Sequence, residues 1–342
     1  MAGRATHVAH GDAESSRLTG DDMDRREFWY AAVSGVALAV PGAGTPFGQL
    51  PRPDRRPERP PYQVPDNVAV RNDLVYTKIG EREVTADLYW PTNGSGPFPA
   101  IVYIHGSGMP NKGRGGSKAA WRRQAALLAA KGFVGLSISY RFRTEVHYPG
   151  CVYDGKAAVR WLRANAKEYR IDPERIGVVG TSFGGYVASM VATTAHRPEL
   201  EGDGSNRGFS SRVQAAVGFA PLVDPIGHHR HNPAPGKFPD FVGARYEDNP
   251  ELWAKASPLE NAGKHCPPFL FFWGTKDHTP ASVAVPKMIQ KLQAAGVHTE
   301  FVIAEGGNHE FYDESPWFER TLQRMEGFFT AYLKQVEAEK RN

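Results

Sequence analysis

The fold is decided by residues 175–191, RIGVVGTSFGGYVASMV. The β-branched run from Ile176 to Val179 is short and apolar, which is typical of a buried strand. Small residues and then bulky apolar ones follow Ser182, as expected for a helix that packs closely against a strand. Ser182 therefore lies at a predicted strand-to-helix corner. Glycines two positions before and two positions after it relieve the crowding of a sharp turn.

Strand-like and helix-like segments alternate along the rest of the chain. Strands are expected over residues 100–104, 133–139, 213–219, 268–274 and 299–305, and helices over 117–131, from Asp154 as N-cap, over 282–295 and from about 318 to 333. This alternation predicts an α/β protein with a mostly parallel sheet and helices on both faces. Residues 73–91 add an antiparallel hairpin that turns near Gly80. In such sheets the active crevice lies at the carboxyl ends of the strands.

Composition narrows the class of protein. The chain has 342 residues, of which 41% are hydrophobic and 23% charged, as in ordinary globular proteins. Its net charge of +4 is small and dispersed, and gives no reason to expect a nucleic-acid partner. Arg114 stands where a phosphate loop needs lysine, which argues against a nucleotide site. Cys151 and Cys266 lack metal-ligand spacing, and whether they pair is left open.

The N-terminus resembles an export signal. Arg25 and Arg26 precede an apolar segment, residues 28–40, that is too short to span a bilayer as a stable anchor. The pattern is similar to a twin-arginine signal, with small residues near 39–43 for cleavage, and predicts a periplasmic or secreted protein that engages the export machinery. A cytoplasmic protein with a fortuitous arginine pair is the alternative. Met1 and Met23 are both candidate starts.

Two further strand ends carry residues that can work with a serine. Asp277 follows the predicted strand 268–274, and His309 follows the strand 299–305. A serine hydroxyl is a weak nucleophile until an imidazole takes its proton, and a carboxylate orients that imidazole. Ser182, Asp277 and His309 are therefore predicted to form a catalytic triad in that chain order. Asp224, which also follows a strand, is an alternative acid.

A glycine-rich loop, HGSG at residues 105–108, directly follows a predicted buried strand. Small residues allow the backbone to approach a substrate carbonyl, so this loop is a candidate oxyanion hole. Gly106, Ser107 and Gly108 form the loop, and their amides act with that of Phe183.

These motifs together resemble the α/β-hydrolase superfamily over residues 70–333. Within it the chain is similar to bacterial esterases and lipases of the hormone-sensitive-lipase-like and acetylxylan/feruloyl-esterase-like groups. The matching segments are DLYWP, IVYIHGSG, SISYRF, DGKAAVRWLRANA, IDPERIGVVGTSFGG and PPFLFFWGTKDHT. The resemblance implies an α/β-hydrolase fold, and it carries the family's triad onto Ser182, Asp277 and His309. Ser107 departs from the usual run of glycines, and Phe183 from the alanine usual in the lipase-like branch.

The resemblance also implies a small cap over the pocket. The Pro- and His-rich segment 224–250 follows a predicted strand in the position of that cap. The histidines between 228 and 231 fit a lid loop better than a metal site, because no cysteine or carboxylate follows at ligand spacing. Three further residues are expected to line the substrate pocket: His105, Tyr140 and Arg141.

The resemblance predicts an exported serine carboxylesterase that acts on small to medium esters, with acetyl or feruloyl esters of carbohydrates as candidate substrates. No metal or organic cofactor is implied. The alternatives are a prolyl-oligopeptidase-like peptidase, whose N-terminal propeller is missing here, and a silent hydrolase-fold binding protein, which would lack a triad member. Predicted domains are an N-terminal extension with the signal (1–44), a Pro/Arg-rich linker (45–69) and the hydrolase domain (70–338). The oligomeric state is left open.

Overall fold

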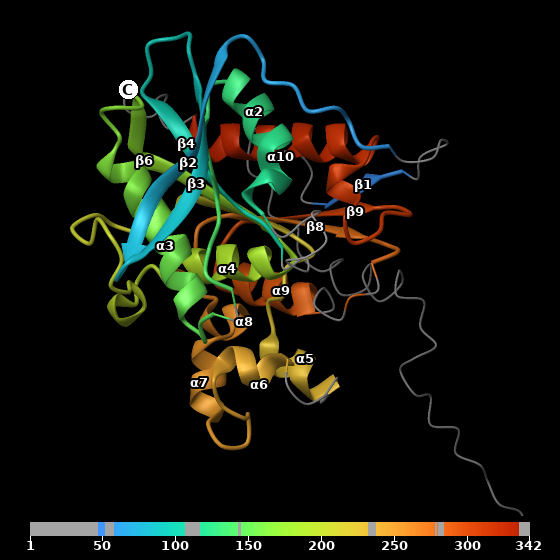
Figure 1. The fold of residues 1–342 in the computed structure, drawn as a ribbon. Coiled ribbons are helices and arrows are strands. Elements are labelled where there is room, and N and C mark those ends of the chain that lie inside the picture. The colour runs from blue at the N-terminus through green and yellow to red at the C-terminus, as the bar shows by residue number, and fades with distance from the viewer. Residues whose placement is uncertain are drawn as a thin grey trace, which may run out of the picture.

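The computed structural model describes residues 47–51, 58–106, 117–142, 145–231, 237–277, 279 and 284–334. Its centre is a twisted nine-stranded sheet with the strand order β1-β9-β8-β7-β6-β4-β5-β3-β2 (Figure 1). The export signal predicted around Arg25 and Arg26 lies outside the described residues.

The sheet is parallel except at one end. The strands are β1 (Phe47–Leu50), β2 (Val68–Ile79), β3 (Arg82–Pro91), β4 (Phe98–Ile104), β5 (Val134–Ile138), β6 (Ile171–Thr181), β7 (Ala215–Phe219), β8 (Phe269–Gly274) and β9 (Thr299–Ala304). The hairpin β2–β3 pairs antiparallel, and β3 runs antiparallel to β5. The pairs from β5 through β4, β6, β7, β8 and β9 to β1 are all parallel. The predicted sheet class is confirmed.

Helices cover both faces of the sheet. They are α2 (Arg122–Ala130), α3 (Gly150–Ala164), α4 (Ser182–Thr193), α5 (Pro225–His231), α6 (Lys237–Val242), α7 (Pro250–Lys255), α8 (Pro258–Asn261), α9 (Val285–Ala294) and α10 (Trp317–Leu333), with short 3₁₀ helices at Lys118–Trp121 (η1), Pro198–Leu200 (η2) and Phe311–Asp313 (η4). One apolar core joins α3, α4 and α9 to the sheet, and a second joins α2 and α10 to its other face (Figure 1). Burial on both faces explains why the central strands are continuous apolar runs.

The segment between β7 and β8 carries α5 to α8, which lie together below the sheet in Figure 1. It includes the segment 224–250 for which a cap is predicted. Among the described residues, no helix is both long and apolar enough to cross a bilayer. Cys151 and Cys266 are both buried and free, so they do not pair with each other.

Two local predictions are wrong. Asp154 does not cap a helix, because α3 already begins at Gly150 and Asp154 lies fully buried inside it, paired with Arg141. The predicted linker 45–69 is not simply an extended connection, because β1 adds to the sheet beside β9 and β2 begins at Val68. In the first case the local pattern is overridden because Asp154 is buried with its charged partner. In the second it is overridden because the backbone of β1 pairs with a distant strand.

Candidate active site

Ser182 lies at a tight corner where β6 ends and α4 begins. Its φ of 54° is in the left-handed region, which few non-glycine residues occupy. The corner is also crowded: a Cβ atom at Gly180 would lie 2.2 Å from the Gly184 carbonyl oxygen, and one at Gly184 would lie 2.2 Å from the His105 carbonyl oxygen. Both glycines are therefore required by close backbone approach. The strained turn presents Ser182 at the N-terminus of a helix, where negative charge is stabilised.

Asp277 and His309 form a hydrogen-bonded pair at the carboxyl ends of β8 and β9. The distance between His309 Nδ1 and Asp277 Oδ2 is 2.7 Å. The Asp277 side chain is fully buried, whereas 31% of the His309 side chain is exposed. Thr279 donates two hydrogen bonds to the other oxygen, Asp277 Oδ1, from its hydroxyl at 2.7 Å and from its backbone N–H at 2.9 Å.

The environment keeps Asp277 ionised. Burial alone would raise the pKa of this carboxyl group, but the hydrogen bond and charge of His309 and the two hydrogen bonds from Thr279 outweigh burial. The pKa of Asp277 is therefore lower than that of an ordinary aspartate. A carboxylate fixed on Nδ1 leaves His309 Nε2 as the nitrogen that can accept a proton.

The loop that carries His309 returns to the corner that carries Ser182. At the end of β8, a Cβ atom at Gly274 would lie 2.4 Å from the Gly307 carbonyl oxygen, so the loops after β8 and β9 are in backbone contact. The Tyr312 ring stacks on Trp121 with centroids 5.0 Å apart, and Trp121 Nε1 donates to the Ile104 carbonyl oxygen at 3.1 Å. The same carbonyl oxygen would lie 2.3 Å from a Cβ atom at Gly184, so it belongs to the Ser182 corner. The structure thus brings His309 and Asp277 to the same sheet edge as Ser182.

The predicted oxyanion loop begins directly beside Ser182. A Cβ atom at Gly106 would lie 3.3 Å from Ser182 Cβ, so only a residue without a side chain leaves this approach unobstructed. Phe183 follows Ser182 in the first turn of α4, where backbone amides lack helical partners. Ser107 and Gly108 lie outside the described residues.

His105 is a buried neutral group under this loop. Its Nδ1 lies 2.8 Å from the Gly106 carbonyl oxygen, and its ring stacks on Tyr140 with centroids 4.6 Å apart. Burial lowers the pKa of His105 to about 4, against the opposing hydrogen bond to Gly106. Nδ1 is therefore the protonated nitrogen and donates to the carbonyl. The Tyr140 hydroxyl in turn donates to the His105 carbonyl oxygen at 2.9 Å.

Arg141, the third predicted pocket residue, is held in an ion pair. Its guanidinium group binds Asp154 at 2.9 to 3.1 Å and also donates to the Gly150 carbonyl oxygen at 3.2 Å. Its backbone N–H donates to Asp154 as well. Arg141 therefore anchors the loop after β5 to α3, and its Nε and Nη2 donors bind groups of α3.

An aromatic cluster adjoins Ser182 that sequence reasoning did not identify in full. The Phe183 ring contacts Phe142 at a centroid distance of 5.2 Å and Phe241 at 5.0 Å, and Tyr140 stacks on it at 6.4 Å. Phe241 belongs to α6, so this helix packs directly on the residue after the serine. The signal for Phe142 is its place two residues after Tyr140. No local pattern marks Phe241, because its contacts are made by a segment far along the chain.

Asp224 and His229 make contacts within the segment between β7 and β8. Asp224 Oδ1 accepts a hydrogen bond from the Gly227 N–H at the start of α5, which is a helix-capping contact. His229 lies 3.9 Å from Glu247. In the part of the chain that the structure describes, no three histidine, cysteine or carboxylate side chains gather as a metal site would require.

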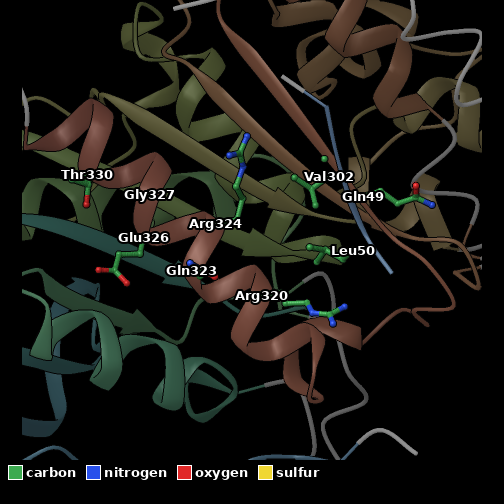
Figure 2. Close-up of a pocket in the computed structure, with 10 residues that line it drawn as sticks. Gln49, Leu50, Val302, Arg320, Gln323, Arg324, Glu326, Gly327 and Thr330 are labelled. Carbon is green, nitrogen blue, oxygen red and sulfur yellow. The ribbon is translucent and has the colours of Figure 1, made fainter. Parts of the chain in front are cut away.

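A separate open cavity of about 750 Å³ lies between α10, the edge strand β1 and its neighbour β9, and Figure 2 shows the side chains around it. Leu50 and Val302 contribute apolar surface, and the polar side chains that line the cavity are Gln49, Arg320, Gln323, Arg324, Glu326 and Thr330. Arg324 is paired with Glu300 at 2.7 Å, and Arg320 donates to the Pro51 carbonyl oxygen at 2.9 Å. None of the residues that line this cavity is a predicted site residue, so it is distinct from the Ser182 site.

Comparison with known proteins identifies the family of this chain. Residues 86–292, more than half of the chain, match the BD-FAE family model. Esterase LipC of Mycobacterium tuberculosis is 29% identical over 223 residues, which are 63% of this chain and 53% of LipC. The chain spans about half the length of the curated relatives LipC and LipQ.

Two solved structures extend the comparison. Esterase 2 of Thermogutta terrifontis, phosphoramylated by tabun, is 26% identical with a TM-score of 0.64, and the match covers 79% of this chain and 97% of that one. A bifunctional GH43-CE protein of Bacteroides eggerthii is 28% identical with a TM-score of 0.65, covering 77% of this chain and 38% of that one. The predicted resemblance to α/β-hydrolase esterases is confirmed, and this chain belongs to the BD-FAE family.

Proposed function

We propose that the protein is an exported serine carboxylesterase that hydrolyses small to medium carboxylic esters through an acyl-enzyme on Ser182. The observation that carries this proposal is the 2.7 Å hydrogen bond between His309 and the buried Asp277 at the edge where the strained Ser182 corner lies. The relatives and neighbours named above are esterases or carry an esterase module in their names, which supports ester bonds as the substrate class.

Each proposed role follows from the chemistry of the group. Ser182 Oγ attacks the ester carbonyl, and His309 Nε2 takes the hydroxyl proton. Asp277 holds the imidazole in the required tautomer and stabilises the imidazolium. The amide of Phe183 and those of the loop that begins at Gly106 stabilise the oxyanion. His309 then gives its proton to the leaving alcohol, and water releases the acid by the same steps.

Esters of carbohydrates, acetyl or feruloyl, are the finer proposal. The bifunctional GH43-CE protein supports it by its name, and an exported enzyme would meet such polymers. The aromatic cluster around Phe183 supplies an apolar wall against which an acyl group or an aromatic ring can pack. The predicted signal at Arg25 and Arg26 is the basis for proposing export.

The test is hydrolysis of p-nitrophenyl acetate, butyrate and octanoate by the full chain and by Ser182→Ala, in purified form and in cell fractions. We expect Ser182→Ala to lose nearly all activity, because removing a nucleophile leaves only about 10³- to 10⁴-fold enhancement over water. Ser189→Ala, a buried serine further along α4, is the matched control and should keep the wild-type rate. The Ser182-dependent activity should appear outside the cytoplasm.

Equal rates for the wild type and Ser182→Ala would remove Ser182 as the nucleophile. Preference for aminoacyl amides over esters would favour the peptidase alternative. Activity confined to the cytoplasmic fraction would refute export and leave the esterase proposal standing.

A further inference from the structure

Part of the predicted linker is packed against the loop that carries His309. We call residues 58–62 the strap. The Arg59 guanidinium group binds Glu310 Oε2 at 2.7 Å and lies 3.3 Å from Asp313 Oδ2. The backbone makes a second connection, because the Ser315 N–H donates to the Glu58 carbonyl oxygen at 2.7 Å. The strap thus contacts both ends of the segment 310–315, which directly follows His309.

The strap is itself fixed to the body of the protein by α2. Arg123 Nε donates to the Pro60 carbonyl oxygen at 2.6 Å, and the Arg123 guanidinium group binds Asp313 Oδ1 at 2.6 Å. The Arg122 guanidinium group lies over the Tyr62 ring, 4.5 Å from its centroid. Asp313 therefore receives arginines from both the strap and α2, and the three segments form one connected polar layer.

The loop has backbone hydrogen bonds of its own, from Gly307 N–H to the Ala304 carbonyl oxygen and within the short 3₁₀ helix η4, but these fix its local shape and not its position against the rest of the protein. Gly306, with a φ of 74°, and Gly307 precede His309, and glycines allow many backbone conformations. On the inner side, Phe311 and Tyr312 are buried and anchor the loop to the core. On the outer side the contacts to the residue next to His309 come from Arg59. A catalytic base has to be held to a fraction of an ångström, since a misplacement of 1 Å can cost about 100-fold in rate.

We propose that Arg59 is a positioning residue for the reaction: through Glu310 and Asp313 it holds the His309 loop, so the N-terminal arm is part of the working site. This inference rests on the proposed role of His309 as the base. An ion pair this exposed adds little to global stability. Its loss is therefore expected to change the rate of the chemical step more than the stability of the fold.

The test compares Arg59→Met, Arg59→Lys, Glu310→Ala and the double variant Arg59→Met/Glu310→Ala in the full chain. We expect kcat for p-nitrophenyl acetate to fall about tenfold in each of Arg59→Met and Glu310→Ala with KM within about twofold of wild type. The double variant should lose little more than Arg59→Met alone, because Arg59→Met already removes the contact that Glu310→Ala breaks. Arg59→Lys should recover part of the rate, since it keeps the charge and loses the forked geometry.

The matched control is Arg197→Met, which removes a half-buried arginine bound to Glu199 at 2.8 Å and to Asn261 at 2.6 Å, beyond the far end of α4 from Ser182. It should leave kcat unchanged. A second readout needs no turnover: in proton NMR, the His309 Nδ1–H donated to Asp277 should exchange with solvent faster in Arg59→Met than in the wild type or Arg197→Met. This signal separates the positioning inference from the esterase proposal, because it responds even if the wild type hydrolyses no ester.

Unchanged kcat and unchanged proton exchange in folded Arg59→Met would overturn the inference. So would additive losses in the double variant. If Arg59→Met does not fold, Glu310→Ala decides the question alone, since it breaks the same bridge from the loop side.

Discussion

The corner that carries Ser182 and the loop that carries His309 are held in place by different means. At the Ser182 corner the contacts are between backbones, and glycines at positions 180 and 184 allow three segments to touch. The His309 loop is instead held by side chains from remote segments: Tyr312 packs on Trp121, and Arg59 and Arg123 bind its carboxylates. Arg59 and Glu310 are 251 positions apart in the sequence.

The difference has a physical basis. A nucleophile corner needs a strained φ, which only tight local geometry can impose. The residues that determine it are therefore neighbours in the sequence. A general base needs orientation, which any rigid scaffold can provide, so its supports come from wherever the fold brings side chains. Substitutions of the glycines that shape the corner should therefore act through the fold, and substitutions of the side chains that support the His309 loop should act through the rate.

The largest effect is expected for Gly184→Ala. The new Cβ would lie 2.2 Å from the His105 carbonyl oxygen and 2.3 Å from that of Ile104, and neither backbone atom can move without displacing β4. We expect the free energy of unfolding to fall by about 3 kcal/mol or more, because buried overpacking against backbone cannot relax. Urea denaturation followed by circular dichroism measures it.

The matched control is Gly327→Ala in α10, where a Cβ would meet nothing within 4 Å. Alanine is favoured over glycine in a helix by about 1 kcal/mol, so this variant should be slightly more stable than wild type. A Gly184→Ala protein as stable as wild type would show that the crowding at the corner is not what fixes it.

This contrast explains what the sequence can predict. Five residues suffice to predict the corner, and short apolar runs predict the strands at 100–104, 268–274 and 299–305. Because parallel strands end at a common edge, Asp277 and His309 are expected to meet there, and their hydrogen bond shows that they do. The corner and the strands each depend on residues that are adjacent in the sequence, so a local sequence pattern can predict them.

The rest depends on contacts between distant segments. Residues 58–62 are rich in proline and charge, which is the composition of a linker, and only the folded chain places Arg59 beside Glu310. The same holds for Phe241, which reaches Phe183 from α6, and for β1, four residues that pair with β9. The local pattern predicts Asp154 as a helix cap because its partner, Arg141, becomes adjacent only when α3 packs.

A smaller effect is expected from pH at the buried His105. Its pKa falls from 6.5 to about 4 on burial, so the unfolded chain binds a proton between these values that the folded chain does not. Stability is therefore full above pH 6.5 and decreases as the pH falls toward 4. The loss from this one group amounts to about 3 kcal/mol at pH 4.

His105→Asn keeps an N–H donor near the Gly106 carbonyl oxygen and removes the titration. We expect its free energy of unfolding, measured by urea at pH 7 and pH 4, to depend less on pH than that of the wild type. Carboxylates titrate in both proteins and cancel in the comparison. Identical pH dependence in the two proteins would mean that His105 is not buried in its neutral form.

The smallest effect is expected for Thr279→Val, which sharpens the comparison from the His309 side. The substitution removes the hydroxyl that donates to Asp277 Oδ1 at 2.7 Å but keeps the backbone N–H that donates to the same oxygen at 2.9 Å. The pKa of Asp277 should rise toward its ordinary value, since one of the hydrogen bonds that lowers it is lost. At pH 7 the carboxylate stays ionised, so what changes is the precision with which it holds His309. A loss of about 1 kcal/mol, less than the full value of a hydrogen bond to a charge, corresponds to about a fivefold decrease in kcat.

Thr279→Ser keeps the donor and should retain most of the rate. A kcat for Thr279→Val within twofold of wild type would mean that backbone donors alone orient the acid, and the two regions would then differ less than their contacts indicate.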